Sequence, residues 1–253
     1  MAAPLKDPSH KVRRFEDQID RTRVFNTPGV VLMLAGATIA VFLILGFSPS
    51  RAARLIEVAG AISPQKFLAG PEANNGVLSM LSPLVSHMFL HAGPMHLIFN
   101  MFWLLAVGTP VARRLGAANA LQSFPAFAAA SLFLSLYFLS GAAGALLHIL
   151  LHSDEAIMLV GASGGVMGLL GAVVRFGLAR PSLFGPEQGR IAPLFSAGVL
   201  TWTGVVIAMN AFAAFFGGSM TGGAKIAWAA HLGGYFFGLL AYPQFERFAR
   251  AYR

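Results

Sequence analysis

Two polar residues lie among small residues in apolar stretches, where a reactive pair could form. Ser163 follows Gly161 and precedes Gly164, while His231 lies three residues before Gly234. A serine hydroxyl becomes a strong nucleophile when a neighbouring base accepts its proton. Histidine suits that role because it titrates near neutral pH. Each motif alone is also typical of close helix packing in membranes, where small residues let helices approach.

Two further hydrogen-bond donors share one predicted helix face. His96 and Asn100 are four residues apart, and His87 and His91 show the same spacing just before them. Donors of this kind stabilise the oxyanion that forms when a nucleophile attacks a carbonyl group, or they bond to a loop. The predicted membrane spans contain no Asp or Glu that could act as a third catalytic member. The residues therefore predict a Ser163–His231 dyad.

The composition indicates that the bilayer is the main solvent of this chain. Hydrophobic residues make up 56% of the 253 residues and charged residues 11%, whereas soluble domains carry about 25% charged residues. The absence of cysteine excludes disulfides, thiolate metal sites and a cysteine nucleophile. The net charge of +8 is spread among apolar segments. We therefore expect a lipid bilayer, and no nucleic acid, as partner.

Spanning a bilayer takes about 20 apolar residues in a helix. The sequence predicts an all-α bundle of six transmembrane helices within one domain, residues 28–243. It is flanked by an N-terminal tail (1–27) and a C-terminal tail (244–253), both cytoplasmic. The predicted spans are 28–47, 94–111, 120–140, 157–174, 193–216 and 226–242, with a half-apolar connection at 141–155.

The distribution of basic residues predicts the orientation. With both termini inside, the inner segments hold 14 of the 18 Lys and Arg residues, as the positive-inside rule requires. The first 27 residues lack the apolar core of a signal peptide. We expect a multi-pass protein of the bacterial inner membrane.

The candidate residues lie at one predicted depth. Spans two, four and six would run from outside to inside. Ser163 lies six residues past the predicted start of span four, and His231 lies six past Lys225. At 1.5 Å per residue, both side chains would lie about 9 Å below the outer boundary. His96 and Asn100 would enter near the same level, which favours one joint site over unrelated packing positions.

Two other classes of protein fit the residues less well. A zinc protease could use His87, His91 and His96 as ligands, but Met88 stands where a His-Glu-x-x-His helix has its glutamate. An ion-coupled transporter or channel would be expected to carry intramembrane carboxylates or two repeated halves. Neither feature is present in the sequence.

From His87 to about Ala241 the chain resembles the rhomboid intramembrane serine proteases. The resemblance implies a six-helix rhomboid core, peptide-bond hydrolysis in or near the transmembrane segment of single-span membrane proteins, and no cofactor or metal. It also implies Ser163 as nucleophile, His231 as base and acid, and His96 and Asn100 as oxyanion donors. The supporting motif residues are His87, His91, Gly161, Gly164, Gly234 and Gly238, in the patterns His-x3-His-x4-His-x3-Asn, Gly-x-Ser-Gly and Ala-His-x2-Gly-x3-Gly.

The sequence departs from the family pattern at two places. No Trp-Arg pair occurs between Arg51 and His87, in the first outer loop. Met167 stands four residues after the serine, where many members have an aromatic ring stacked on the histidine; a thioether can also pack against a ring. Inactive relatives that bind membrane clients typically lack the serine or the histidine. Both are present here, so proteolysis is the leading hypothesis and client binding the alternative.

Overall fold

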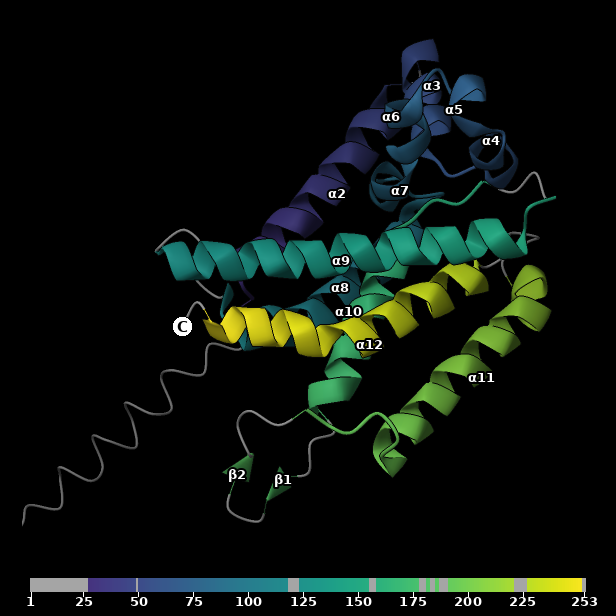
Figure 1. The fold of residues 1–253 in the computed structure, drawn as a ribbon. Helices are drawn as coiled ribbons and strands as arrows, with labels where there is room; N and C mark the ends of the chain where they lie inside the picture. Colours follow the sequence, from purple (N-terminus) through teal and green to yellow (C-terminus); the bar gives the residue numbers. More distant parts are fainter. Residues whose placement is uncertain are drawn as a thin grey trace, which may run out of the picture.

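The computed structural model describes residues 27–48, 50–117, 123–154, 158–177, 181–182, 185–186, 191–220 and 227–251. These residues are almost entirely helical (Figure 1). The long helices are α2 (Gly29–Phe47), α8 (Pro94–Leu115), α9 (Phe124–Leu151), α10 (Ser163–Gly177), α11 (Ala197–Met220) and α12 (Trp228–Ala251). Between α2 and α8 lie α3 (Arg51–Gly60), α4 (Pro64–Leu68), α5 (Gly70–Ala73), α6 (Val77–Leu81), α7 (Pro83–Ser86) and the 3-10 turn η1 (His87–Phe89). The two strands β1 (Pro181–Ser182) and β2 (Gly185–Pro186) form one short antiparallel pair.

The chain is an all-α integral membrane protein. One long helix overlaps each of the six ranges predicted as spans. Four helices are long and apolar enough to cross a membrane, namely α2, α8, α9 and residues 197–215 of α11. The helix α10 has only 15 residues. The count of six spans and the orientation with both termini inside therefore stay predictions.

Three helix boundaries differ from the sequence prediction. The helix α9 continues to Leu151, so the predicted connection at 141–155 is wrong over residues 141–151, which are helical. Helix α10 begins at Ser163 instead of near Ile157, because the backbone of Gly161 has a φ of +123° that no helix contains. Helix α12 continues to Ala251, so most of the predicted C-terminal tail is helical. The predicted N-terminal tail, apart from residue 27, lies outside the described residues.

The helices α8, α9, α10 and α12 form the central bundle. In Figure 1, α9 and α12 run side by side across the molecule, with α8 and α10 behind them. The helix α2 packs on α8, and the short helices α3–α7 gather at the far end of α2. The helix α11 lies at the edge and leans on α12 (Figure 1).

Glycines let the central helices approach closely. A Cβ atom on Gly238 would overlap the backbone carbonyl group of Gly168, and one on Gly234 would overlap that of Gly164. A Cβ atom on Gly171 would overlap the backbone of Tyr235. The repeated glycines of α10 therefore face α12, as the small-residue pattern indicates.

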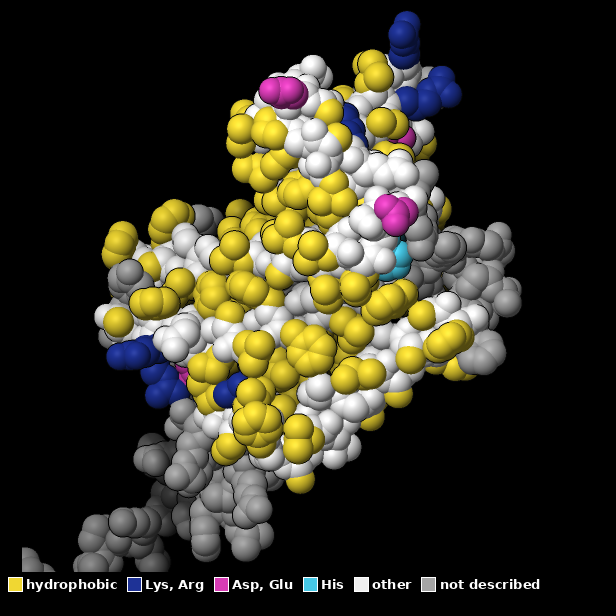
Figure 2. Space-filling view, turned by 45° about the vertical axis from the view of Figure 1, so that its right-hand side comes forward, with side chains coloured by type: hydrophobic (Ala, Val, Ile, Leu, Met, Phe, Trp, Pro, Cys, Tyr) yellow, Lys and Arg dark blue, Asp and Glu magenta, His cyan; other side chains and the backbone are white. Residues whose placement is uncertain are grey.

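Hydrophobic side chains cover the outside of the bundle. In Figure 2, a broad apolar face separates charged groups at the two ends of the molecule. Large apolar side chains on this surface include Met33, Phe99, Phe102, Trp202 and Met209, each about half exposed or more. In water such a surface would aggregate, whereas in a bilayer the lipid tails cover it.

Candidate active site

Ser163 lies at the first residue of α10, held there by the extended segment before it. Leu159 pairs with Ile62 through two backbone hydrogen bonds, with N···O distances of 3.1 and 2.8 Å. The Gly161 N–H donates to the His87 carbonyl at 2.9 Å. Residues 158–162 are not helical, so the helical rise assumed before Ser163 is wrong, and the depth of Ser163 in the membrane stays a prediction. As the first residues of a helix, Ser163 and Gly164 have N–H groups without an intrahelical acceptor.

His231 lies in the first turn of α12 and contacts Ser163 directly. The distance from His231 Nε2 to Ser163 Oγ is 2.9 Å. The approach depends on small residues: a Cβ atom on Gly144 would overlap the carbonyl oxygen of Ala230, and Gly164 lies against the same residue. The structure thus brings together the two residues predicted to form the dyad.

A third side chain on α11 contacts the histidine from its other side. His231 Nδ1 lies 3.0 Å from Asn210 Oδ1. Asn210 is buried, and its Nδ2 donates to the Val206 carbonyl at 2.9 Å. The sequence analysis missed Asn210, because it searched for a carboxylate as the third member. The available signal was a polar amide within a predicted span, where burial is costly and partners are required.

The two predicted oxyanion donors lie at the start of α8. A Cβ atom on Gly161 would lie 2.9 Å from His96 Nε2, so the imidazole ring packs directly against the backbone before Ser163. His96 Nδ1 accepts from the Ala92 N–H at 3.4 Å. Since Nδ1 is an acceptor in this contact, the ring proton is on Nε2, which faces Gly161. His96 can therefore donate a hydrogen bond toward the Ser163 region.

Asn100 is tied to its own helix. Its Nδ2 donates to the His96 carbonyl at 2.9 Å, and the residue is buried. An amide nitrogen carries two hydrogens, so Asn100 has a second hydrogen that can donate to another acceptor. This hydrogen bond links Asn100 to the helical turn that carries His96.

The supporting histidines occupy the loop that leads into α8. His87 is buried, and its Nδ1 donates to the Pro83 carbonyl at 2.7 Å. The backbone N–H of Ala162 donates to His91 Nε2 over a long 3.5 Å distance. The His91 ring and the His87 backbone carbonyl therefore hold the segment before Ser163, while the His87 ring bonds within its own turn.

Met167 lies one turn after Ser163, and its described packing partners are apolar. It packs on the cluster that includes Val206, Tyr235 and Leu239, between α10, α11 and α12. The described contact that orients the His231 ring is the hydrogen bond to Asn210.

Metal binding has no ligand set in the part of the chain that the structure describes. No group of three His, Cys, Asp or Glu side chains converges there as a metal ion would require. His91 and His96 lie with ring centroids 5.1 Å apart, while His87 is turned to Pro83. The zinc alternative therefore gains no support from the geometry.

Comparison with known proteins identifies the family. The sequence model of the rhomboid domain matches residues 78–245, which is about two thirds of the chain and includes α8 to α11 and most of α12. No curated protein sequence matches the chain. The matched region holds Ser163, His231, Asn210, His96 and Asn100. The chain belongs to the rhomboid family.

Proposed function

We propose that this rhomboid protein is an intramembrane serine endopeptidase that cuts membrane proteins in or near a transmembrane segment, using Ser163 and His231. The observation that carries the proposal is the 2.9 Å contact between Ser163 Oγ and His231 Nε2. These atoms belong to two residues that are 68 positions apart in the sequence and lie on different helices. A serine and a histidine in hydrogen-bond reach are the minimal pair for acyl transfer.

The reaction begins with proton transfer. His231 Nε2 accepts the hydroxyl proton while Ser163 Oγ attacks the peptide carbonyl, forming a tetrahedral intermediate. The imidazolium then donates that proton to the leaving amine, and an acyl-enzyme remains. Water then attacks the acyl-enzyme while His231 accepts a proton from it. His231 returns this proton to Ser163 Oγ, and the second product leaves.

The negative charge on the intermediate needs fixed donors. The Ser163 N–H has no intrahelical acceptor at the helix start, and His96 Nε2 faces the adjacent backbone. Donors fixed before the reaction stabilise such an oxyanion strongly, each contributing about 10²–10³ in rate. Asn100 supports this group through its bond to the His96 carbonyl.

The substrate class and location belong to the same proposal. A site enclosed by membrane helices fits a substrate that is itself a membrane protein with one span. The charge bias of the sequence supports a site near the extracytoplasmic side of a bacterial inner membrane.

A fluorophosphonate probe tests the proposal on purified protein in detergent. We expect the probe to label wild type at Ser163, and both labelling and cleavage of a single-span substrate to fall to background in Ser163→Ala. His231→Ala should lose about 10²–10⁴-fold of the cleavage rate, the usual contribution of a positioned acid–base group. Ser135→Ala, an exposed serine of α9, is the matched control and should behave as wild type.

The opposite result would favour another function. A folded wild-type protein that binds a single-span protein, but neither cleaves it nor reacts with the probe, would be a client-binding member of the family. Cleavage that persists in Ser163→Ala would exclude Ser163 as nucleophile.

A further inference from the structure

Asn210 differs from its neighbours on α11. Most of this helix faces outward, with Ile207 43%, Met209 66% and Phe212 56% exposed. Asn210 is only 6% exposed and points to α12, where its Oδ1 meets His231 Nδ1. A buried amide in an apolar helix is costly unless its polar atoms are satisfied. Both ends of this amide have partners.

The second contact of the amide sets its orientation. Asn210 Nδ2 donates to the Val206 carbonyl at 2.9 Å. If the amide were turned over, its oxygen would face that carbonyl oxygen and the two acceptors would repel each other. The Val206 carbonyl therefore keeps Oδ1 directed at the histidine, so the contact with His231 has an acceptor on the asparagine side.

The acceptor oxygen of Asn210 that faces His231 Nδ1 determines which ring nitrogen carries the proton. A neutral imidazole carries one N–H, and Asn210 Oδ1 binds that hydrogen when it is on Nδ1. Nε2 is then unprotonated and faces the Ser163 hydroxyl at 2.9 Å, ready to accept its proton. The other tautomer would place an N–H against the serine and leave Nδ1 and Oδ1 as two facing acceptors.

From these contacts we infer that Asn210 is a positioning residue that holds His231 in the Nδ1–H tautomer and in the ring orientation that proton transfer from Ser163 requires. The inference rests on the proposed protease function. It extends the Ser163–His231 pair to a relay of three side chains, contributed by α10, α12 and α11. Because amides stay uncharged, the relay adds no carboxylate to the membrane interior.

Three variants separate positioning from packing. Asn210→Leu keeps the branching at Cγ and removes the acceptor, while Asn210→Asp keeps an acceptor oxygen. The matched control is Thr203→Val, because the Thr203 hydroxyl makes another polar contact between α11 and α12, 2.9 Å from the Tyr235 hydroxyl. Thr203→Val loosens the same helix pair without touching His231.

Two readouts apply to each full-length variant in detergent. The first is kcat and KM for a single-span substrate. We expect kcat of Asn210→Leu to fall about 10- to 100-fold, a part of the roughly 10²–10⁴-fold that a positioned acid–base group contributes. Its KM should stay near the wild-type value, because Asn210 acts on the histidine and not on substrate binding. Asn210→Asp should retain more activity than Asn210→Leu, and Thr203→Val should stay within about twofold of wild type.

The second readout does not depend on activity. In protein labelled with ¹⁵N in the histidine rings, the nitrogen shifts distinguish a protonated from an unprotonated ring nitrogen, and His231→Gln assigns the signals. Wild type and Thr203→Val should show protonated Nδ1 and unprotonated Nε2, while Asn210→Leu should lose this single state.

Three results would overturn the inference. They are a wild-type His231 protonated on Nε2, an Asn210→Leu protein with unchanged tautomer and kcat, and equal losses of kcat in Asn210→Leu and Thr203→Val. A wild-type protein without cleavage or probe labelling would instead refute the protease function, while the ring shifts would still report whether Asn210 sets the tautomer.

Discussion

Histidines near Ser163 differ in the contacts that hold them. His231 bonds to Asn210 and Ser163, whereas His91 sits in the loop before α8 and accepts from the Ala162 backbone. Burial, together with the nearby His96, lowers the pKa of His91 to about 4. Burial likewise lowers the pKa of His87 to about 4, although its hydrogen bond to the Pro83 carbonyl acts in the opposite direction. The loop around Ser163 is thus built on neutral imidazoles.

The low pKa of His91 predicts a loss of stability in acid. The pKa is 6.5 in an unfolded chain and about 4 in the folded protein, so the unfolded state binds more protons between these values. The stability from the neutral ring is fully present above pH 6.5 and is lost as the pH falls toward 4. We expect the melting temperature in detergent to drop by several degrees over this window.

His91→Gln provides the comparison for that measurement. Glutamine keeps an acceptor for the Ala162 N–H and does not titrate. The variant should lose less of its melting temperature between pH 6.5 and 4 than wild type does. Identical pH dependence in the two proteins would show that His91 does not contribute.

At the level of helices, backbone contact between α10 and α12 places Ser163 beside His231. The glycines of both helices face each other, so carbonyl groups of one helix touch Cα atoms of the other. Such contact supports the close, preorganised geometry that a proton transfer needs. A larger residue in this seam would separate the helices along their length.

Gly238→Ala should destabilise the fold by about 1–3 kcal/mol or more, the usual cost of overpacking, because its Cβ would overlap the backbone of Gly168 and backbone cannot turn away. Thermal unfolding in detergent, followed by fluorescence, measures the effect. Gly36→Ala is the matched control: a Cβ atom on this α2 glycine would meet no neighbouring atom within 4 Å, and alanine favours a helix by about 1 kcal/mol over glycine. Equal melting temperatures for the two variants would contradict tight packing at Gly238.

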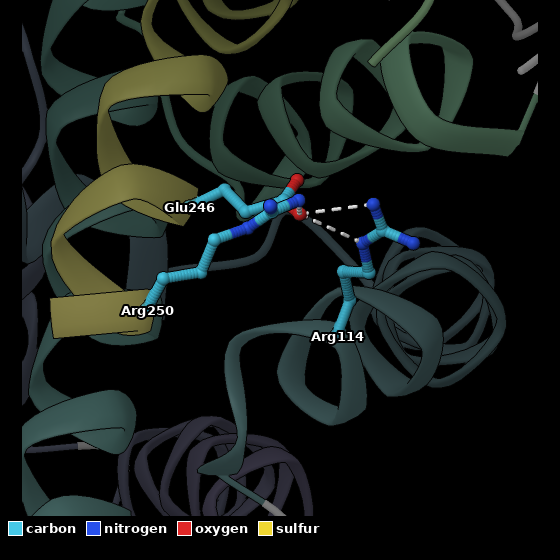
Figure 3. Close-up of polar contacts among 3 residues, drawn as sticks. All are labelled: Arg114, Glu246 and Arg250. Atoms are coloured by element: carbon cyan, nitrogen blue, oxygen red, sulfur yellow. Dashed lines mark hydrogen bonds and ion pairs between the residues drawn. The ribbon is translucent and has the colours of Figure 1, made fainter. Parts of the chain in front are cut away.

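Across the whole molecule, α8, α10 and α12 run in the same direction. Their first turns meet around Ser163, while their last turns meet at an ion-pair network (Figure 3). The buried Glu246 of α12 binds Arg114 of α8 at 2.9 Å and Arg250 at 2.6 Å. The Arg114 guanidinium also lies 5.4 Å from the ring centre of Phe176, on α10. One cluster of side chains therefore joins the three helices at the end away from the reactive pair.

Glu246→Gln should lower stability by about 2–4 kcal/mol. Removing one member of a buried ion pair typically costs about 3–5 kcal/mol, and the side chains of Arg114 and Arg250 are 22% and 48% exposed, which reduces the loss. Chemical or thermal unfolding in detergent measures it. Arg247→Gln, on the exposed side of the same turn, should change stability by no more than about 0.5 kcal/mol.

The same variant also tests how far the network acts. Glu246 lies 15 residues after His231 along α12, a helical distance of about 22 Å. Probe labelling of Ser163 per folded molecule should therefore equal that of wild type. A loss of labelling without unfolding would mean that the far end of the bundle controls the site.

The class of fold and most residues of the candidate site follow from the sequence alone. Long apolar stretches must be helical in a membrane, because every backbone polar group needs an internal partner. The helices α2, α8 and α11 therefore lie close to the predicted ranges. Ser163, His231 and His96 stood out because polar groups within apolar segments are costly, and the structure brings these three residues together.

How α10 begins and what holds the histidine follow instead from tertiary packing. The start at Ser163 depends on the pairing of Leu159 with Ile62, which are far apart in the chain, so no local pattern contains it. The contact of Asn210 with His231 depends on how α11 leans on α12. Periodicity predicts which residues form a helix, but the packing of one helix on another decides which side chains meet.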